Sequence, residues 1–167
     1  MTKLPPPDSR YLDAAKGWLE LEALDEVKRE LGSIRPEFQE HPDVLEVRWA
    51  LAANDGDWNE ALVISESIIR LAPGKPEGWI YRGSALAEMN RHNDAYTVLF
   101  QGHQRFPQDE IPAYDLACVC CAMGRNDEAA EWIRKAVAMA GEEIRRRALE
   151  DPDLEQIHDR LRSSKAD

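Results

Sequence analysis

Residues 76–109 read PEGWIYRGSALAEMNRHNDAYTVLFQGHQRFPQD, and this stretch shows the period on which the whole chain is built. The same residue types recur in the same columns when the chain is cut every 34 residues, at Asp8, Pro42, Pro76 and Glu110. A period of this length is typical of helix-turn-helix units that stack side by side and bury one continuous core. The chain is therefore predicted to be an array of helical hairpins.

Three columns show the period most clearly. The first holds small side chains where the second helix of a hairpin is expected to cross the first at closest approach, at Ala61, Ala95 and Ala129. The second holds turn residues that tolerate positive φ, at Gly56, Asn90 and Gly124. The third ends the second helices of the hairpins, at Pro73, Pro107 and Gly141.

Each unit contains two apolar-periodic segments separated by a turn, as helical hairpins require. The first helices are predicted near residues 9–20, 43–53, 77–89 and 110–123. The second helices are predicted near residues 23–32, 57–71, 92–105 and 126–140. No segment alternates with period two, so no sheet is expected.

The two ends of the chain depart from the repeat. Residues 1–7 include three consecutive prolines, which favour an extended conformation, so we expect a tail, with Asp8 or Ser9 capping the first helix. After Gly141 we expect one short helix over 142–149 and another over 153–162, whose apolar residues cover the last repeat. The whole chain, 1–167, is predicted to be one domain, with repeats near 8–41, 42–75, 76–109 and 110–141 and a cap over 142–162.

These columns resemble those of tetratricopeptide repeat (TPR) proteins over about residues 8–141. The third unit carries the resemblance best, through Trp79, Arg82, Gly83, Leu86, Ala95, Leu99, Gly102 and Pro107. The first unit departs from the pattern, with Val27 in the small column and Glu22 in the turn column. The resemblance implies an all-α fold: a right-handed superhelical array (alpha-alpha superhelix) of antiparallel helix pairs, made of four TPR-like repeats and C-terminal capping helices.

In the TPR family the first helices line a concave groove that binds a partner's peptide or helix. The matching positions of this chain are Asp13, Lys16, Glu46, Val47, Asn54, Glu77, Tyr81, Ser84, Glu88, Tyr114, Asp115 and Cys118. The resemblance therefore implies a mixed aromatic and acidic surface, which suits a basic or amphipathic peptide. The alternative is that these are ordinary solvated positions of a scaffold.

Some family members bind a carboxylate-terminated ligand through a clamp of Lys, Asn and Arg. Counted from the first repeat, the clamp positions hold Leu12, Lys16, Val47, Glu77 and Tyr81. Counted from the second repeat, they hold Glu46, Ala50, Tyr81, Ile111 and Asp115. Only Lys16 is basic, and it stands where the clamp has Asn, so such a ligand is not expected.

The charge of the chain argues against nucleic acid and membrane partners. The formal net charge is −11, which repels phosphate backbones and anionic lipids. No apolar run is long enough to span a membrane, and no signal peptide begins the chain, so a cytoplasmic location is expected. Three closely spaced cysteines on one helix, at Cys118, Cys120 and Cys121, cannot bridge to each other, which fits a reducing compartment.

No pattern in the sequence indicates catalysis. The cysteines lack a histidine or second cysteine pair at ligand spacing, so we predict no metal and no cofactor. The four histidines are scattered over four segments, and no catalytic residues are predicted.

We expect a non-catalytic protein-interaction module or scaffold. Two alternatives stay open: a small cytoplasmic chaperone of the type III secretion translocator class, and an enzyme accessory subunit. The oligomeric state is also open.

Overall fold

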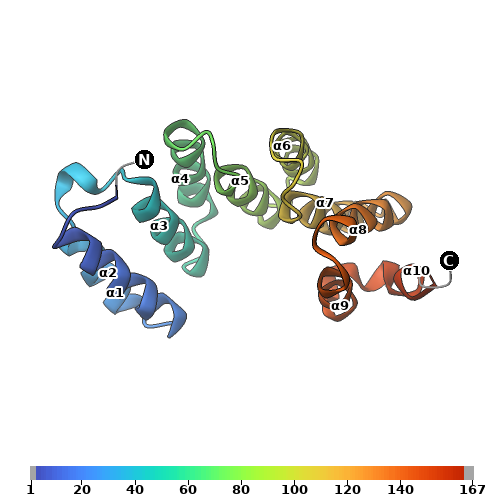
Figure 1. The fold of residues 1–167 in the computed structure, drawn as a ribbon, viewed down its shortest axis with the longest axis horizontal. Helices are drawn as coiled ribbons and strands as arrows, with labels where there is room; N and C mark the ends of the chain where they lie inside the picture. Colours follow the sequence, from blue (N-terminus) through green and yellow to red (C-terminus); the bar gives the residue numbers. More distant parts are fainter. Residues whose placement is uncertain (1–2, 164–167) are drawn as a thin grey trace. The chain divides into compact units, whose positions relative to one another are not determined.

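The computed structural model describes residues 3–163, and in this part of the chain every regular element is a helix (Figure 1). The α-helices are α1 Asp8–Glu20, α2 Leu24–Ser33, α3 Pro42–Asn54, α4 Trp58–Leu71, α5 Glu77–Glu88, α6 His92–Arg105, α7 Ile111–Ala122, α8 Asn126–Ala140, α9 Glu142–Glu150 and α10 His158–Ser163. Two 3-10 helices are η1 Pro36–Phe38 and η2 Pro152–Ile157. The all-α prediction is confirmed, and α1 to α8 begin and end within one residue of their predicted bounds.

The turn inside each hairpin has the same geometry in all four repeats. One residue takes a left-handed conformation, with φ of 55° at Glu22, 72° at Gly56, 58° at Asn90 and 72° at Gly124. The next N–H donates to a carbonyl five residues earlier at 2.8–3.0 Å, from Ala23 to Trp18, Asp57 to Ala52, Arg91 to Leu86 and Arg125 to Cys120. Both partners therefore recur every 34 residues. The first repeat makes this turn although its sequence places a glutamate there.

The chain forms two compact units, Met1–Tyr81 and Arg82–Asp167, and their boundary lies within α5. In the first unit α1 packs against α2 and α3 against α4. Leu12 and Ala15 of α1 meet Val27 and Leu31 of α2 in a core that also contains Val44 of α3. Val27 fills the small-residue column and, like Ala61, is fully buried.

Asp8 has a role that the sequence did not predict. It does not cap α1, because its side chain accepts hydrogen bonds from Arg35, from the backbone N–H at 2.8 Å and from Nε and Nη2 at 2.8 and 2.6 Å. The Arg35 guanidinium holds the pKa of the Asp8 carboxyl below its ordinary value, chiefly through these hydrogen bonds. The fully buried carboxylate thus ties the start of α1 to the segment after α2.

The segment before α1 is packed against the first unit and is not an extended tail over its described residues. Leu4 is only 5% exposed and belongs to the same core as Leu12. The N–H of Ser9 donates to the carbonyl of Pro5 at 3.1 Å, which continues the first helical turn backwards. The apolar side chain of Leu4 explains the difference, because it can leave water only by folding onto the helices. Residues 1 and 2 lie outside the described residues.

In the second unit α7 packs against α6 and α8, and η2 packs against both α7 and α8. Ala95 and Ala129 are fully buried, as their column predicted. The expected single helix over 153–162 is wrong in type, because η2 precedes α10. The N–H of Leu154 donates to the Asp151 carbonyl three residues earlier, and this tighter turn places Leu154 and Ile157 on one side. Both are fully buried, so the predicted covering of the last repeat is confirmed.

No helix among residues 3–163 is both long enough and apolar enough to cross a membrane.

The helices are short and closely spaced, and glycine permits one of the tightest contacts. At Gly78, near the start of α5, an added Cβ would lie 2.8 Å from the backbone nitrogen of Ile69 in α4. Side chains can move aside, but backbone cannot without shifting the helix.

Replacement of Gly78 by alanine is expected to lower the free energy of unfolding by about 1–3 kcal/mol through overpacking. Gly17→Ala in α1 is the matched control, because nothing lies within 4 Å of its added Cβ. The control is expected to gain about 0.5–1 kcal/mol from helix propensity. Chemical denaturation of both variants measures the difference, and equal stability of the two would contradict the close approach of α4 and α5.

Candidate functional site

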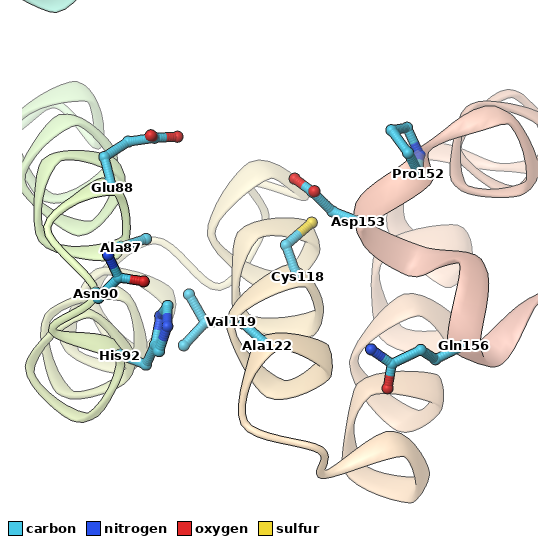
Figure 2. Close-up of a pocket in the computed structure, with 10 residues that line it drawn as sticks. All are labelled: Ala87, Glu88, Asn90, His92, Cys118, Val119, Ala122, Pro152, Asp153 and Gln156. Atoms are coloured by element: carbon cyan, nitrogen blue, oxygen red, sulfur yellow. The ribbon is translucent and has the colours of Figure 1, made fainter. Parts of the chain in front are cut away.

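The second unit has a surface groove made of two hollows of about 480 and 230 Å³. Figure 2 shows the larger hollow, with Ala87 and Glu88 on one side, α7 in the middle and η2 on the other side. The two hollows share the lining residues Ala87, Glu88, Cys118, Val119 and Asp153. We call this surface, between residues 83–92 and η2 with α7 as its floor, the α5–α7 groove.

Helical spacing explains which side chains line the groove. Ser84, Ala87 and Glu88 lie three and four residues apart in α5, so they share one helix face. In α7 the same spacing brings Asp115, Cys118 and Ala122 to the floor. Gly83 lets α5 lie close to α6 beside the smaller hollow, because a Cβ added to Gly83 would lie 2.4 Å from the Leu99 side chain of α6.

Tyr114 joins α7 to the C-terminal segment at the edge of the smaller hollow. Its hydroxyl donates to Asp151 Oδ2 at 2.6 Å, and the Arg147 guanidinium of α9 lies 4.5 Å from its ring centroid. Burial, followed by the hydrogen bond to Asp151, raises the pKa of the Tyr114 phenol. Because the side chain is only 2% exposed, Tyr114 acts first as a structural anchor and only at its edge as a groove residue.

Asp115 is the most perturbed carboxyl group in the groove. Burial raises its pKa to about 7 from 3.8, while Arg147 opposes the shift and Asp109 and Asp151 add to it. The Asp115 carboxyl makes no hydrogen bond or ion pair with any residue in the described part of the chain. A carboxyl group in this state changes charge near neutral pH, so the groove can gain or lose one negative charge there.

Cys118 lies on the floor of both hollows, and in Figure 2 its side chain points toward Asp153. Burial raises the pKa of the Cys118 thiol, and the nearby Asp115 and Asp151 carboxylates raise it further. The thiol is therefore protonated at neutral pH, which makes it a weak nucleophile and a weak metal ligand. Among residues 3–163, no three His, Cys, Asp or Glu side chains are placed to hold a metal ion together.

Five of the twelve residues predicted for a peptide groove line the α5–α7 groove: Ser84, Glu88, Tyr114, Asp115 and Cys118. The sequence did not predict the other lining residues, among them the charged residues Arg147, Asp151 and Asp153, which come from the C-terminal segment beyond the repeats. The sequence pattern showed that this segment covers the last repeat, but nothing in it indicated that the segment also forms one wall of the groove.

Three more of the predicted residues, Glu46, Glu77 and Tyr81, lie near one another in the first unit. The Lys75 ammonium lies 3.4 Å from Glu46 Oε1, and the Glu46 and Glu77 carboxylates both favour its charged form. Tyr81 stacks on Trp49 with ring centroids 4.3 Å apart, and burial, followed by Glu46 and Glu77, raises its pKa to about 12. Glu46 and Tyr81 are thus already engaged within the unit.

The remaining predicted residues lie apart from these groups. Asp13 and Lys16 are exposed on α1, and Asn54 at the end of α3 donates to the Ala50 carbonyl at 2.9 Å. Val47 is 3% exposed and lies in the core of the first unit, so its prediction as a contact residue is wrong. The repeat pattern does not separate the two roles, because core and groove positions lie side by side on a helix that is apolar almost all round.

No protein-family model matches the chain, and no curated protein matches it. Several solved structures do. TTC0263, a thermophilic TPR protein of Thermus thermophilus, has a TM-score of 0.75 at 18% identity, covering 95% of this chain and 83% of that one. MamA from Desulfovibrio magneticus RS-1 has a TM-score of 0.69 at 18% identity, covering 96% and 92%.

A third similar structure is the APC/C hetero-tetramer Cut9-Hcn1, with a TM-score of 0.73 at 17% identity, covering 92% of this chain but 30% of that one. At sequence identities of 17–18%, the similarity to these structures shows a shared fold and nothing about a shared function. The chain therefore has the fold of TPR proteins, which confirms what the resemblance in sequence implied about its architecture.

Replacement of Asp115 by asparagine is expected to flatten part of the pH dependence of stability. The folded-state pKa of about 7 is above the unfolded value of 3.8, so the folded state holds the proton more tightly. Protonation of Asp115 therefore stabilises the folded wild type at low pH. This contribution to the free energy of unfolding, roughly 1–4 kcal/mol, is lost as pH rises through the folded pKa. Denaturation of both proteins between pH 5 and 8 measures the difference, and parallel curves would contradict the raised pKa.

Proposed function

We propose that this chain is a non-catalytic protein-interaction module that holds a segment of a partner protein in the α5–α7 groove. The observation that carries the proposal is the groove itself: two hollows that share one floor and are lined by three separate parts of the second unit. An elongated surface of this kind suits an extended or helical segment whose successive side chains enter successive hollows.

The lining of the groove favours binding over catalysis. Apolar contact comes from Ala87 and Val119, while polar groups stand around the rim. The Cys118 thiol is held in its protonated form by burial, which leaves it unsuited to attack a substrate. This combination of apolar and polar lining is typical of recognition sites.

The charge of the groove indicates a basic or amphipathic partner segment. Glu88, Asp115, Asp151 and Asp153 line the smaller hollow, and Arg147 is the cation that lines it with them. The chain as a whole carries a formal charge of −11, which draws basic segments toward it. The Cut9-Hcn1 structure is a hetero-tetramer, so this fold is compatible with holding another chain.

Selection from a phage-displayed library of random peptides tests the proposal on the full chain. Enriched peptides are expected to bind the Ala87→Arg variant at least about tenfold more weakly than the wild type, because Ala87 lines both hollows and the arginine side chain would extend into them. Val63→Arg is the matched control, because Val63 is 65% exposed on α4 in the other unit, and it is expected to bind as the wild type does.

Both variants are first compared with the wild type by circular dichroism, so that unfolding is recognised as such. The proposed function fails if no peptide is enriched, or if the enriched peptides bind Ala87→Arg and the wild type with equal affinity.

A further inference from the structure

Asp115 differs from Asp8, Glu46 and Asp151, which are also partly or fully withdrawn from water, because those three carboxylates have partners. Asp8 accepts three hydrogen bonds from Arg35, and Glu46 has Lys75 at 3.4 Å. Asp151 accepts from the Tyr114 hydroxyl through one oxygen and from the N–H of Asp153 through the other. Asp115 lines the smaller hollow with no such partner among the described residues. A half-buried carboxylate that faces a hollow without a partner is suited to a cation from outside.

The nearest cation within the protein does not take that place. The guanidinium of Arg147 lines the same hollow and acts on the charge of Asp115, but it lies over the Tyr114 ring. No ion pair joins Arg147 to a carboxylate in the described part of the chain. The aromatic ring thus holds the guanidinium to one side and leaves the Asp115 carboxylate open toward the hollow.

We infer that the smaller hollow is a subsite for one lysine or arginine side chain of the bound partner, with the Asp115 carboxylate as its ion-pair acceptor and Arg147 as the charge that limits its affinity. This inference rests on the proposed function and names the partner chemistry of that groove. Glu88 and Asp153 are exposed, and their carboxylates have no counter-charge of their own in the described residues, so they add to the attraction at the rim.

The size of the subsite supports a single side chain as the occupant. The smaller hollow has about 230 Å³, which is below the roughly 300–1,000 Å³ of pockets that hold cofactor-sized or drug-sized molecules. The adjoining hollow of about 480 Å³ shares its floor and can receive the neighbouring residues of the same segment. A partner segment would therefore place one basic side chain in the smaller hollow and the neighbouring residues in the larger hollow.

Binding at this subsite is expected to depend on pH. Only the ionised Asp115 attracts a cation, and its pKa of about 7 means that the ionised fraction falls as pH falls from 8 to 6. Affinity for a basic side chain should therefore weaken toward pH 6. The charged and titratable groups that face Asp115 are Asp109, Tyr114, Cys118, Glu88, Arg147, Asp151 and Asp153.

The inference is tested by titrating the full chain with N-acetyl-arginine amide, followed by amide chemical shifts in NMR spectra. N-acetyl-citrulline amide is the matched probe, because it keeps the shape of arginine and lacks its charge. The arginine probe is expected to shift the amides of Asp115 and Cys118 at pH 8, and the citrulline probe is expected to bind at least about fivefold more weakly.

Two variants are expected to change the affinity in opposite directions. Asp115→Asn removes the acceptor charge, so it should weaken the arginine probe about fivefold at pH 8 and reduce the pH dependence of its affinity. Arg147→Met keeps an apolar contact with Tyr114 and removes the competing charge, so it should tighten the arginine probe about twofold at a pH high enough to keep Asp115 ionised in the variant, where the pKa of Asp115 is raised further. A damaged fold cannot produce the second result.

The inference is overturned if the two probes bind with equal affinity, if neither binds, or if Asp115→Asn binds arginine as the wild type does. It is also overturned, while the proposed function stands, if library peptides that need the groove bind equally well after their basic residues are changed to glutamine. Failure of the library selection itself counts against the proposed function. It does not decide the subsite, because the arginine and citrulline probes are tested without the library.

Discussion

The turn inside each hairpin is the constraint on which the rest of this structure depends. One residue in the left-handed conformation lets the next N–H bond back across the end of the first helix, and this reverses the chain within a few residues. The second helix then starts at the same place in every repeat, at Leu24, Trp58, His92 and Asn126. With the start fixed, the small residues that follow fall at the buried face of the hairpin, where Ala61, Ala95 and Ala129 are fully enclosed.

The groove of the second unit follows from the same spacing. Gly83 lets the backbone of α5 approach the Leu99 side chain of α6, and residues spaced three and four apart in α7 line the two hollows. The C-terminal segment then supplies a wall that a repeat array alone would lack. Tyr114 fixes this wall through Asp151 and Arg147, so the residue that anchors the segment also determines the charge beside the groove.

Asp8 and Asp115 show how the same side chain serves two purposes in one chain. Asp8 is buried with a guanidinium and a backbone N–H as partners, so its pKa is lowered and the ion pair holds the first unit together. Asp115 is half-buried beside a hollow without such partners, so its pKa is raised and its charge is costly. A cost of this kind is typical of sites that await a ligand, and it is the physical basis of the subsite inferred for the groove.

The sequence by itself determined the helices, the turns and the buried small residues, because each of these repeats every 34 residues and depends on local preferences. It also led to Ser84, Glu88, Asp115 and Cys118, which share helix faces that the repeat defines. Only the tertiary structure decided the bond from Asp8 to Arg35, the burial of Leu4 and Val47, and the place of Arg147 and Asp151 beside Tyr114. These contacts join residues far apart along the chain, and no period in the sequence marks them, since they form only when the packed helices bring their side chains together.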